Sequence, residues 1–323
     1  MSVLVFAENW EGKFKKPTFE AITYAYELAQ KTGESVIAVV PGSNIAEDEI
    51  KKLGEYGCSK VLYVNNSALA SFRAALYTAV MAEAATKENA KLIVFSYTYS
   101  GKSVAPRLAA RLKAGLVAAA VALPSSTQPF TVKKKCFSGK GFTDVEVTSD
   151  IKIIGLSPNS HHITLNSANV SIESFSPTLP ASDTTVNEVK KTSGKVVLTE
   201  AEIVVSGGRG LKGPENWGMI ENLADAMGAA TACSKPVADM GWRPHHEHVG
   251  QTGITISPNV YIAIGISGAI QHLAGVSSSR VIVVINTDKE APFFKVADYG
   301  IVGDAFQVVP KLTESVKQLK ASH

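Results

Sequence analysis

The chain has 323 residues, of which 45% are hydrophobic and 19% charged, and its formal net charge is +3. This composition is typical of a folded globular protein, and the length favours two hydrophobic cores over one. The small net charge argues against a strongly basic nucleic-acid-binding protein, so no nucleic acid is expected as a partner. No apolar run approaches the length of a membrane-spanning helix, so no membrane insertion is expected either.

The three cysteines, Cys58, Cys136 and Cys233, lie far apart and include no Cys-x-x-Cys pair. Scattered thiols in odd number indicate neither a disulfide framework nor a zinc site, and they fit a reducing compartment. The first residues show neither a secretory signal pattern nor an Arg-rich leader. We therefore expect a cytoplasmic bacterial protein, or a mitochondrial matrix protein only if a leader has been removed.

The first half of the chain alternates predicted strands with predicted helices. Helical stretches of this length between strands favour βαβ units and a parallel sheet. Gly33 is suited to end the first of these helices. The strands are expected at residues 3–6, 36–40, 60–64 and 92–96, and the helices at residues 19–31, 46–56, 71–89 and 104–112.

Short alternating segments without helices between them follow, at residues 145–148, 151–156 and 170–175. Their pattern predicts antiparallel strands that extend or cover the first sheet. The polar residues 179–193 then predict a linker between two domains. The N-terminal α/β domain is accordingly expected over residues 1–190.

A second domain is predicted over residues 195–323, where the alternation of strands and helices resumes. This pattern predicts a doubly wound α/β domain of the kind that binds nucleotides. A helix is expected to begin near Pro310, with the proline in its first turn, and to run through Leu319. The strands are expected at residues 203–205, 261–264, 281–285 and 299–302.

Two of these strands run into glycine-rich turns. Residues 203–205 lead into Ser206-Gly207-Gly208-Arg209-Gly210, with a helix expected over about residues 215–227, and residues 261–264 lead into Gly265-Ile266-Ser267-Gly268. Such turns let backbone N–H groups approach an anion, and the carboxyl ends of neighbouring parallel strands are where open α/β sheets bind ligands. The pair of turns predicts contact with an anion, in which Arg209 could pair with phosphate or carboxylate in bidentate fashion. The spacing of the G-x-G-x-x-G fingerprint is missing, and a tight turn without a ligand is the alternative.

Other polar residues allow both a binding and a structural interpretation. The turn Gly250-Gln251-Thr252-Gly253 offers hydrogen bonds to the edge of a heterocycle, or is simply a turn. His272 could donate to a carbonyl oxygen that gains charge, or be a structural histidine near a helix start. Asn286 and Asp304 could contact a ribose or phosphate, or serve turn chemistry.

No catalytic residues and no metal ligands are predicted. His245, His246 and His248 surround Glu247 in a Pro-containing loop without cysteine, which does not indicate a metal site. No nucleophile lies in a recognisable motif, and no pair of carboxylates stands out. A protein that carries a cofactor without substrate chemistry of its own fits these absences.

Several long runs resemble the electron transfer flavoprotein α subunit. They are Ser206–Lys212, Val249–Gly253, Tyr261–Gly275, Ile285–Pro292 and Val296–Asp304. The runs cover nearly all of the second domain, whereas the first domain is similar in general layout only. The resemblance implies a heterodimer with a β subunit and one FAD held mainly by the C-terminal domain. The N-terminal domain would then bind partners and no nucleotide.

The resemblance also implies a role in electron transport. Members of the family carry electrons from acyl-CoA and other flavin dehydrogenases to a membrane-bound quinone oxidoreductase. Thr252 would hydrogen-bond near the central ring of the flavin, and His272 would face its pyrimidine carbonyl and stabilise the anionic one-electron form. Asn286 and Asp304 would hold the adenosine side. The cofactor-binding set implied by position is Arg209, Ser234, Lys235, Gln251, Thr252, Gly253, Gly265, Ser267, Gly268, Gln271, His272, Asn286 and Asp304.

One position departs from the family pattern, because Lys235 stands where an arginine usually lies beside the flavin. Lysine keeps the positive charge but not the planar fork of a guanidinium group. We therefore expect FAD binding to persist, while the potentials of the two one-electron steps remain open, since that side chain would tune the flavin.

Three alternatives stay open at this point. The chain could belong to an electron-bifurcating flavoprotein with a second FAD in the β subunit. It could be an enzyme of deacetylase or synthase type that binds NAD or thiamine diphosphate. It could also be a nucleotide-sensing scaffold built on the first domain, where Tyr97–Ser103 has a superficial likeness to the end of a Walker A motif.

Overall fold

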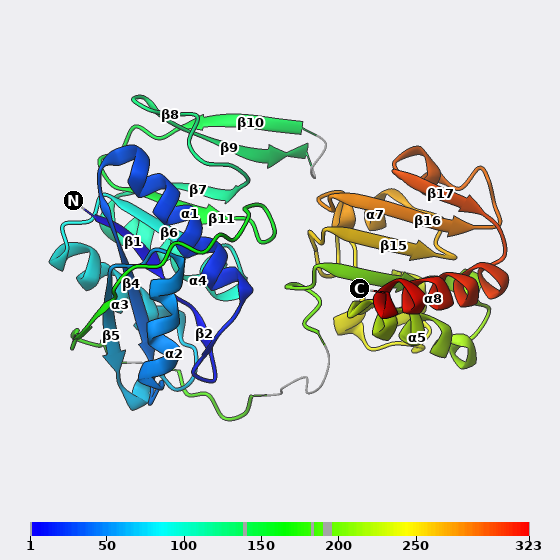
Figure 1. Cartoon of the computed structure of the whole chain (residues 1–323), viewed down its shortest axis with the longest axis horizontal. Helices are drawn as coiled ribbons and strands as arrows, with labels where there is room; N and C mark the ends of the chain where they lie inside the picture. Colours follow the sequence, from blue (N-terminus) through cyan, green and yellow to red (C-terminus); the bar gives the residue numbers. More distant parts are fainter. Residues whose placement is uncertain (1, 138–140, 182–183, 190–195, 323) are drawn as a thin grey trace. The chain divides into compact units, whose positions relative to one another are not determined.

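The structure is a computed structural model that describes residues 2–137, 141–181, 184–189 and 196–322. The chain divides into two compact units (Figure 1), Met1–Cys136 with Gly141–Lys190, and Phe137–Lys140 with Lys191–His323. We call them the N-terminal and C-terminal units. Of the predicted linker, residues 182–183 and 190–193 lie outside the described residues, and residues 184–189 are exposed without helix or strand.

The N-terminal unit is built on a ten-stranded sheet whose order is β10-β9-β7-β11-β6-β1-β4-β5-β12, with β8 paired to β9. Its parallel strands are β1 (Ser2–Phe6), β4 (Ser35–Gly42), β5 (Lys60–Asn65), β6 (Leu92–Ser96), β7 (Gly115–Ala120), β11 (Lys152–Leu156) and β12 (Ser171–Ser174). An antiparallel ribbon of β8 (Ser126–Thr127), β9 (Phe130–Cys136) and β10 (Gly141–Glu146) extends one edge. A separate hairpin pairs β2 (Asn9–Trp10) with β3 (Lys13–Phe14).

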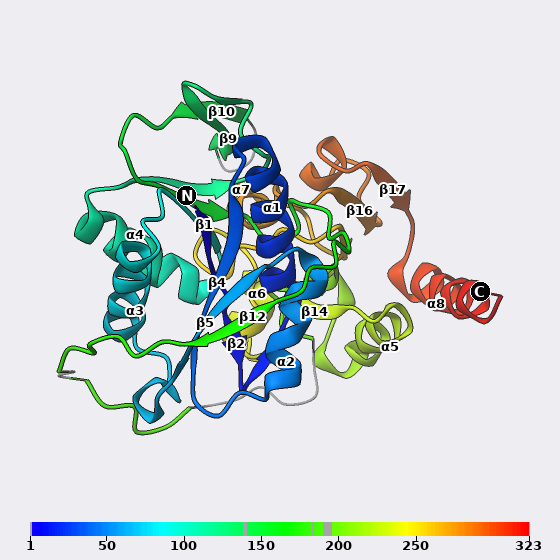
Figure 2. The ribbon, with the colours of Figure 1, turned by 60° about the vertical axis from the view of Figure 1, so that its left-hand side comes forward.

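Helices cover both faces of this sheet. Its helices are α1 (Lys16–Thr32), α2 (Glu47–Lys51), α3 (Ala74–Lys87) and α4 (Tyr99–Leu112), with short 3-10 helices at Lys52–Tyr56 and Ser67–Leu69. Figures 1 and 2 show α1 and α2 on one face and α3 and α4 on the other. In β1, Val3 and Val5 pack with α1, while Leu4 and Phe6 pack with α3 and α4. Both faces of a parallel strand are therefore apolar, which explains its continuous hydrophobic sequence.

The expectation of antiparallel strands after residue 115 is confirmed for β10 and wrong for β11 and β12. β11 lies inside the sheet, parallel to β6 and β7, and β12 lies at the far edge, parallel to β5. A parallel connection normally contains a helix. Here the ribbon β8–β10 connects β7 to β11, and the irregular residues 157–170 connect β11 to β12. Because neither connection contains a helix, nothing in the sequence indicated that β11 and β12 pair in parallel.

A buried carboxylate holds the irregular segment 157–170 in place. Glu20 of α1 is 1% exposed and accepts hydrogen bonds from the backbone N–H groups of Asn159 (3.0 Å), Ser160 (2.7 Å) and His161 (2.8 Å). Burial raises the pKa of Glu20, although these three N–H groups oppose the rise. The carboxylate thus satisfies backbone donors that no helix or strand would satisfy.

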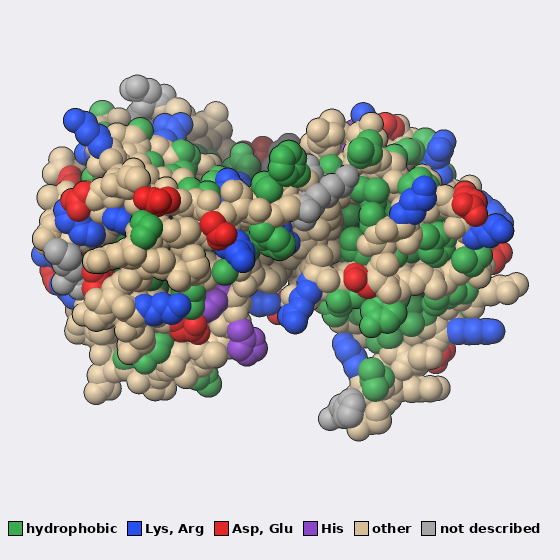
Figure 3. Space-filling view, turned by 90° about the horizontal axis from the view of Figure 1, so that it is seen from above, with side chains coloured by type: hydrophobic (Ala, Val, Ile, Leu, Met, Phe, Trp, Pro, Cys, Tyr) green, Lys and Arg blue, Asp and Glu red, His purple; other side chains and the backbone are tan. Residues whose placement is uncertain are grey.

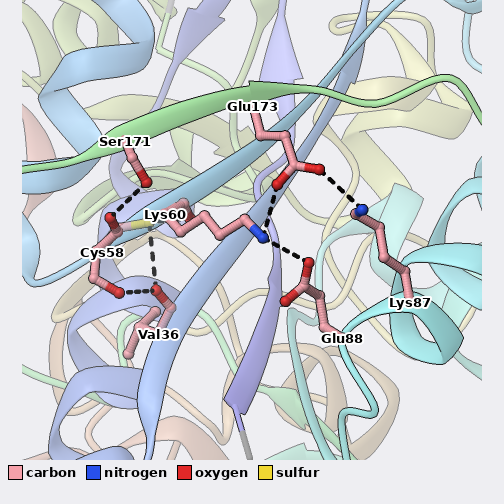
Figure 4. A network of polar contacts seen from close by, with 8 residues as sticks. Val36, Cys58, Lys60, Lys87, Glu88, Ser171 and Glu173 are labelled. Atoms are coloured by element: carbon pink, nitrogen blue, oxygen red, sulfur yellow. Dashed lines mark hydrogen bonds and ion pairs between the residues drawn. The ribbon is translucent and has the colours of Figure 1, made fainter.

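The edge strand β12 is attached by an ion-pair network (Figure 4). Lys60 of β5 lies 2.8 Å from a carboxylate oxygen of Glu173 in β12 and 2.8 Å from one of Glu88, which follows α3. Lys87 binds the second oxygen of Glu173 at 2.9 Å. The neighbouring carboxylates raise the pKa of Lys60, with Glu173 as the larger cause. One ammonium group thus joins three segments that are distant in sequence.

The C-terminal unit has a five-stranded, all-parallel sheet in the order β14-β13-β15-β16-β17. Its strands are β13 (Ile203–Gly207), β14 (Ala230–Cys233), β15 (Val260–Ile264), β16 (Val281–Asn286) and β17 (Tyr299–Val302). Its helices are α5 (Gly218–Met227), α6 (Lys235–Asp239), α7 (Ile270–Val276) and α8 (Ala305–Ala321), with 3-10 helices at Arg209–Leu211, Pro214–Asn216, His245–Glu247 and Pro292–Lys295. α5 and α8 pack on one face and α7 on the other, which confirms the doubly wound α/β prediction.

Two predicted helix starts were too late because their capping residues had not been considered. α8 begins at Ala305, where the Asp304 side chain accepts from the Phe306 N–H at 3.0 Å, so Pro310 lies inside the helix. α4 begins at Tyr99, where Thr98 Oγ1 accepts from the Gly101 N–H at 3.2 Å. In both cases the N-cap side chain, and not the apolar pattern, sets the first residue of the helix.

The substitution Lys60→Met tests the attachment of β12. We expect the free energy of unfolding to fall by about 1 kcal/mol, because Glu88 and Glu173 lose their shared partner, and the loss to shrink in high salt. Urea unfolding at low and high ionic strength measures both effects. Lys51→Met is the matched control, since Lys51 pairs with Glu47 on an exposed helix turn. Equal losses for the two variants would contradict the assigned role of Lys60.

Candidate functional site

The strand order of the C-terminal unit reverses between β13 and β15. In chain order the five strands are arranged 2-1-3-4-5, so the connection after β13 runs to one side of the sheet and the connection after β15 to the other. Such a reversal opens a crevice at the carboxyl ends of the two strands, where doubly wound proteins bind their ligands. The two glycine-rich turns of the sequence lie at this point.

The two turns are in direct backbone contact. The Gly208 N–H donates to the Ile264 carbonyl at 2.9 Å, and the Gly210 N–H donates to the Gly265 carbonyl at 3.0 Å. A Cβ atom on Gly208 would lie 2.2 Å from the Gly265 oxygen, and one on Gly210 would lie 2.7 Å from the Gly265 Cα. These glycines are therefore needed for close approach of the backbones.

A cavity of about 530 Å³ lies beside these turns and has the size of many small-molecule sites. Of the thirteen residues predicted to bind FAD, ten line it: Arg209, Ser234, Lys235, Gln251, Thr252, Gly265, Ser267, Gln271, His272 and Asn286. They come from the turns after β13, β14 and β15, from the first turns of α6 and α7, from the last residue of β16 and from the loop before β15. The fold thus brings together residues that are spread over almost eighty positions of the sequence.

The other three predicted residues lie outside this lining. Gly253 packs on His248, since a Cβ there would lie 2.4 Å from the His248 carbonyl oxygen. Gly268 has φ +86° and packs against Phe293. Asp304 caps α8. Gly253 and Gly268 each adjoin residues that line the cavity, whereas Asp304 does not.

Sequence reasoning missed part of the lining. Pro236, Val249, Ile266 and Ala269 line the cavity but carry no polar group that would single them out, and His248 was considered only as a metal ligand. Gly210 and Gly250, which also line it, had been considered as turn residues, and Asp288 lines it as well. For Ile266 and Ala269, the position within or beside a glycine turn was the available signal, because a turn at a strand end exposes its residues to the crevice.

Hydrogen bonds fix the loops around the cavity. The Gln251 N–H donates to the Gln271 carbonyl at 2.7 Å, and the Asn286 side-chain amide donates to the Ile266 carbonyl at 3.0 Å. The Asn286 side-chain oxygen accepts from the Asp288 N–H at 3.1 Å. Asn286 therefore holds two turns together. This agrees with turn chemistry, which was one of the two roles considered for Asn286 from the sequence.

The charged groups of the cavity suit an anion. Arg209 and Lys235 are exposed, and within the described ranges neither forms an ion pair with a carboxylate. Ser234, next to Lys235, is buried and offers a hydroxyl group. Unpaired cations beside glycine-rich turns are suited to phosphate.

His272 gives the cavity a neutral polar group. The side chain is 7% exposed, its Nε2 lies 2.7 Å from the Tyr261 hydroxyl, and its Nδ1 has no hydrogen-bond partner among the described residues. Burial, and secondarily the nearby His248, lower the pKa of His272 to about 4. The imidazole is therefore uncharged at neutral pH. A buried polar atom without a partner fits a site whose ligand supplies the partner.

The described part of the chain contains no group of three or more His, Cys, Asp or Glu residues placed to hold a metal ion. Of the residues considered for such a site, Glu247 instead binds Arg243 at 2.6 and 2.8 Å. Among the described helices, none combines the length and the apolar character needed to cross a membrane.

A doubly wound domain with a cavity at its strand-order reversal, glycine turns in contact and unpaired cations defines a nucleotide-cofactor-binding protein. Comparison with known proteins specifies the class further. The family model described as the electron transfer flavoprotein domain matches residues 3–193, and the one described as the electron transfer flavoprotein FAD-binding domain matches residues 197–277.

Curated relatives agree over nearly the full length. Electron transfer flavoprotein subunit alpha of Bacillus subtilis is 41% identical, with 98% of each chain covered, and that of Syntrophomonas wolfei is 37% identical, with 97% of this chain and 98% of the relative covered. Protein FixB of Clostridium saccharobutylicum is 34% identical, with 98% and 96% covered. The chain belongs to the electron transfer flavoprotein α-subunit family. Its cofactor is FAD, and its role is electron transfer.

Solved structures were also matched, among them a putative thiamin diphosphate-dependent enzyme from Mycobacterium smegmatis. The two chains are 11% identical with a TM-score of 0.24, and the match covers 97% of this chain and 59% of the enzyme's chain. This likeness is too weak to support an argument about fold or function.

The substitution Gly208→Ala tests the contact between the two turns. The φ of Gly208 is −118°, which any residue adopts, so the clash with the Gly265 carbonyl is the main penalty. We expect a loss of about 2 kcal/mol or more in the free energy of unfolding, together with loss of FAD on gel filtration. Gly218→Ala is the control, because nothing lies within 4 Å of a Cβ there. A Gly208→Ala protein as stable as the control would refute the contact.

The depressed pKa of His272 predicts a pH dependence of stability. The group has an ordinary pKa of 6.5 and a folded pKa of about 4. Between these values unfolding takes up a proton, so its contribution to stability is full above pH 6.5 and falls as the pH drops toward 4. We expect the free energy of unfolding of His272→Gln to decrease less steeply with falling pH than that of the wild type, by up to about 1.4 kcal/mol per pH unit.

Urea unfolding from pH 7.5 to 4.5, followed by tryptophan fluorescence, measures this slope. Trp217 and Trp242 report on the C-terminal unit. His246→Gln is the control, because His246 is exposed. Parallel curves for wild type and His272→Gln would show that His272 titrates equally in both states.

Proposed function

We propose that this chain is the α subunit of a heterodimeric electron transfer flavoprotein that holds one FAD in the C-terminal cavity. The proposed complex accepts electrons from flavin dehydrogenases, acyl-CoA dehydrogenases among them, and delivers them to a membrane quinone oxidoreductase. The observation that carries the proposal is the cavity at the strand-order reversal, where unpaired cations meet a neutral imidazole whose Nδ1 has no partner among the described residues. The proposed setting is the bacterial cytoplasm, since the matched relatives come from bacteria.

The residues present fit FAD. When bound, its flavin supplies the one-electron exchange that side chains cannot provide. Arg209 and Lys235 would meet the negative charge of the diphosphate or of the reduced flavin. Gln251 and Thr252 would hydrogen-bond to the flavin edge, and His272 would face a flavin carbonyl. Gly253, Gly268 and Asp304 complete the proposed set, with Asp304 toward the adenosine.

An exposed apolar edge supports pairing with a β subunit. Tyr299, Ile301 and Val302 of the edge strand β17 are 66%, 41% and 60% exposed, and Val296 just before the strand is 45% exposed. Figure 3 shows hydrophobic side chains gathered on the C-terminal unit in that view. Exposed apolar groups on an unpaired strand edge are a typical protein-contact surface.

The N-terminal domain, residues 1–190, is assigned to partner binding without a nucleotide. Its own strand-order reversal lies between β1 and β6. Thr98, which caps α4 there, donates its hydroxyl to the carboxylate of Glu8 just after β1. A carboxylate at this place repels a phosphate group, which argues against a nucleotide sensor built on this domain.

Co-purification with a β subunit tests the proposal. We expect one FAD for each heterodimer, measured by the absorbance of flavin released by heat, and reduction of that FAD by an acyl-CoA dehydrogenase with its substrate. Reoxidation by a quinone oxidoreductase tests the acceptor. Two FADs for each heterodimer would replace the proposal with the bifurcating alternative. A colourless complex would overturn it.

A further inference from the structure

Tyr261 is a buried residue that touches the site without lining the cavity. It lies in β15 and is 0% exposed, and its hydroxyl oxygen is 2.7 Å from Nε2 of His272. Its ring stacks on Phe293 with centroids 6.2 Å apart, and Phe293 meets the edge of the His272 ring at 5.7 Å. The phenol of Tyr261 and the phenyl ring of Phe293 therefore both contact the imidazole and fix its position.

The surrounding groups decide the direction of the hydrogen bond. Burial raises the pKa of Tyr261, so the phenol keeps its proton. The only hydrogen-bond partner of the phenol among the described residues is Nε2 of His272, and the Ser206 hydroxyl has no partner among them. If the phenol accepted a proton from Nε2, its own proton would need Ser206, so the structure favours a phenol that donates to His272. On the other side of the imidazole, Nδ1 has no hydrogen-bond partner among the described residues.

Only one neutral tautomer satisfies these groups. A ring with its proton on Nδ1 accepts the phenol proton at Nε2 and presents an N–H on its open side. The other tautomer would direct a lone pair toward that side, and the phenol would have to turn its proton to Ser206. The choice between the two neutral forms of a histidine is set by the hydrogen bond at its far nitrogen.

We propose that Tyr261 is a positioning residue whose hydroxyl donates to Nε2 of His272 and fixes its tautomer, so that Nδ1 offers an N–H to a carbonyl of the bound flavin. This inference rests on the proposed contact between His272 and FAD. Without the phenol, the imidazole can present a lone pair to the carbonyl oxygen, which repels it. FAD binding is then expected to weaken about tenfold or more.

The variants Tyr261→Phe and Tyr24→Phe test the proposal in the full heterodimer. Each removes one buried tyrosine hydroxyl, and that of Tyr24 lies in the N-terminal unit, where it donates to the Ala122 carbonyl at 3.0 Å. The proton position on His272 is read from ¹⁵N NMR of histidine-labelled protein stripped of FAD, with His272→Gln for assignment among the seven histidines. The FAD dissociation constant is measured separately by fluorescence quenching on re-addition.

We expect wild type and Tyr24→Phe to show the proton on Nδ1 and equal FAD affinity. Tyr261→Phe should show a mixture of tautomers and about tenfold weaker FAD binding. A proton on Nε2 in the wild type, or an unchanged tautomer in Tyr261→Phe, would overturn the proposal. A changed tautomer with unchanged FAD affinity would overturn the step to the flavin, while the FAD stoichiometry of the wild type reports independently on the proposed function.

Ser206→Ala keeps the test decisive if Tyr261→Phe does not fold. With Ser206 removed, the phenol can donate only to His272, so the proton on Nδ1 should be retained. If the chain of hydrogen bonds ran the other way, Ser206 would be the final acceptor, and its removal would change the tautomer. Such a change would overturn the proposed direction.

Discussion

The contact between two backbone turns is the constraint on which the site depends. Gly208 and Gly210 reach the Gly265 backbone at distances that leave no room for a side chain. This approach fixes the ends of β13 and β15 against each other, at the place where the strand order reverses. Because the turns cannot separate or rotate independently, the side chains that follow them are placed in a defined crevice before any cofactor binds.

The polar groups of the site differ in charge according to how deeply they are buried. Its cations, Arg209 and Lys235, are exposed and stay hydrated, whereas the buried imidazole of His272 is uncharged at neutral pH. A buried charge without a partner would be costly, so a neutral group is what burial permits at this place. The crevice can thus attract anions at its mouth and offer a directed hydrogen bond in its interior.

Much of this could be predicted from sequence, and the errors have physical causes. The β-strands and glycine turns of the C-terminal unit follow local rules, and ten predicted site residues do meet in one cavity. The parallel placement of β11 and β12 could not be predicted, since no helix marks their connections and Glu20 holds one of them from a distant helix. Tyr261 was also missed, because a buried tyrosine in a strand has the same local pattern as any core residue.

The connection from β11 to β12 has a consequence for the order of folding. β12 is the last strand of the N-terminal sheet and pairs with β5 at the edge away from β11. All ten strands of that sheet are therefore complete by Ser174, before any of the C-terminal unit's strands has been synthesised. Domains generally fold as units during synthesis, with the N-terminal one first. The N-terminal domain can thus fold while the strands of the FAD-binding domain are still being synthesised.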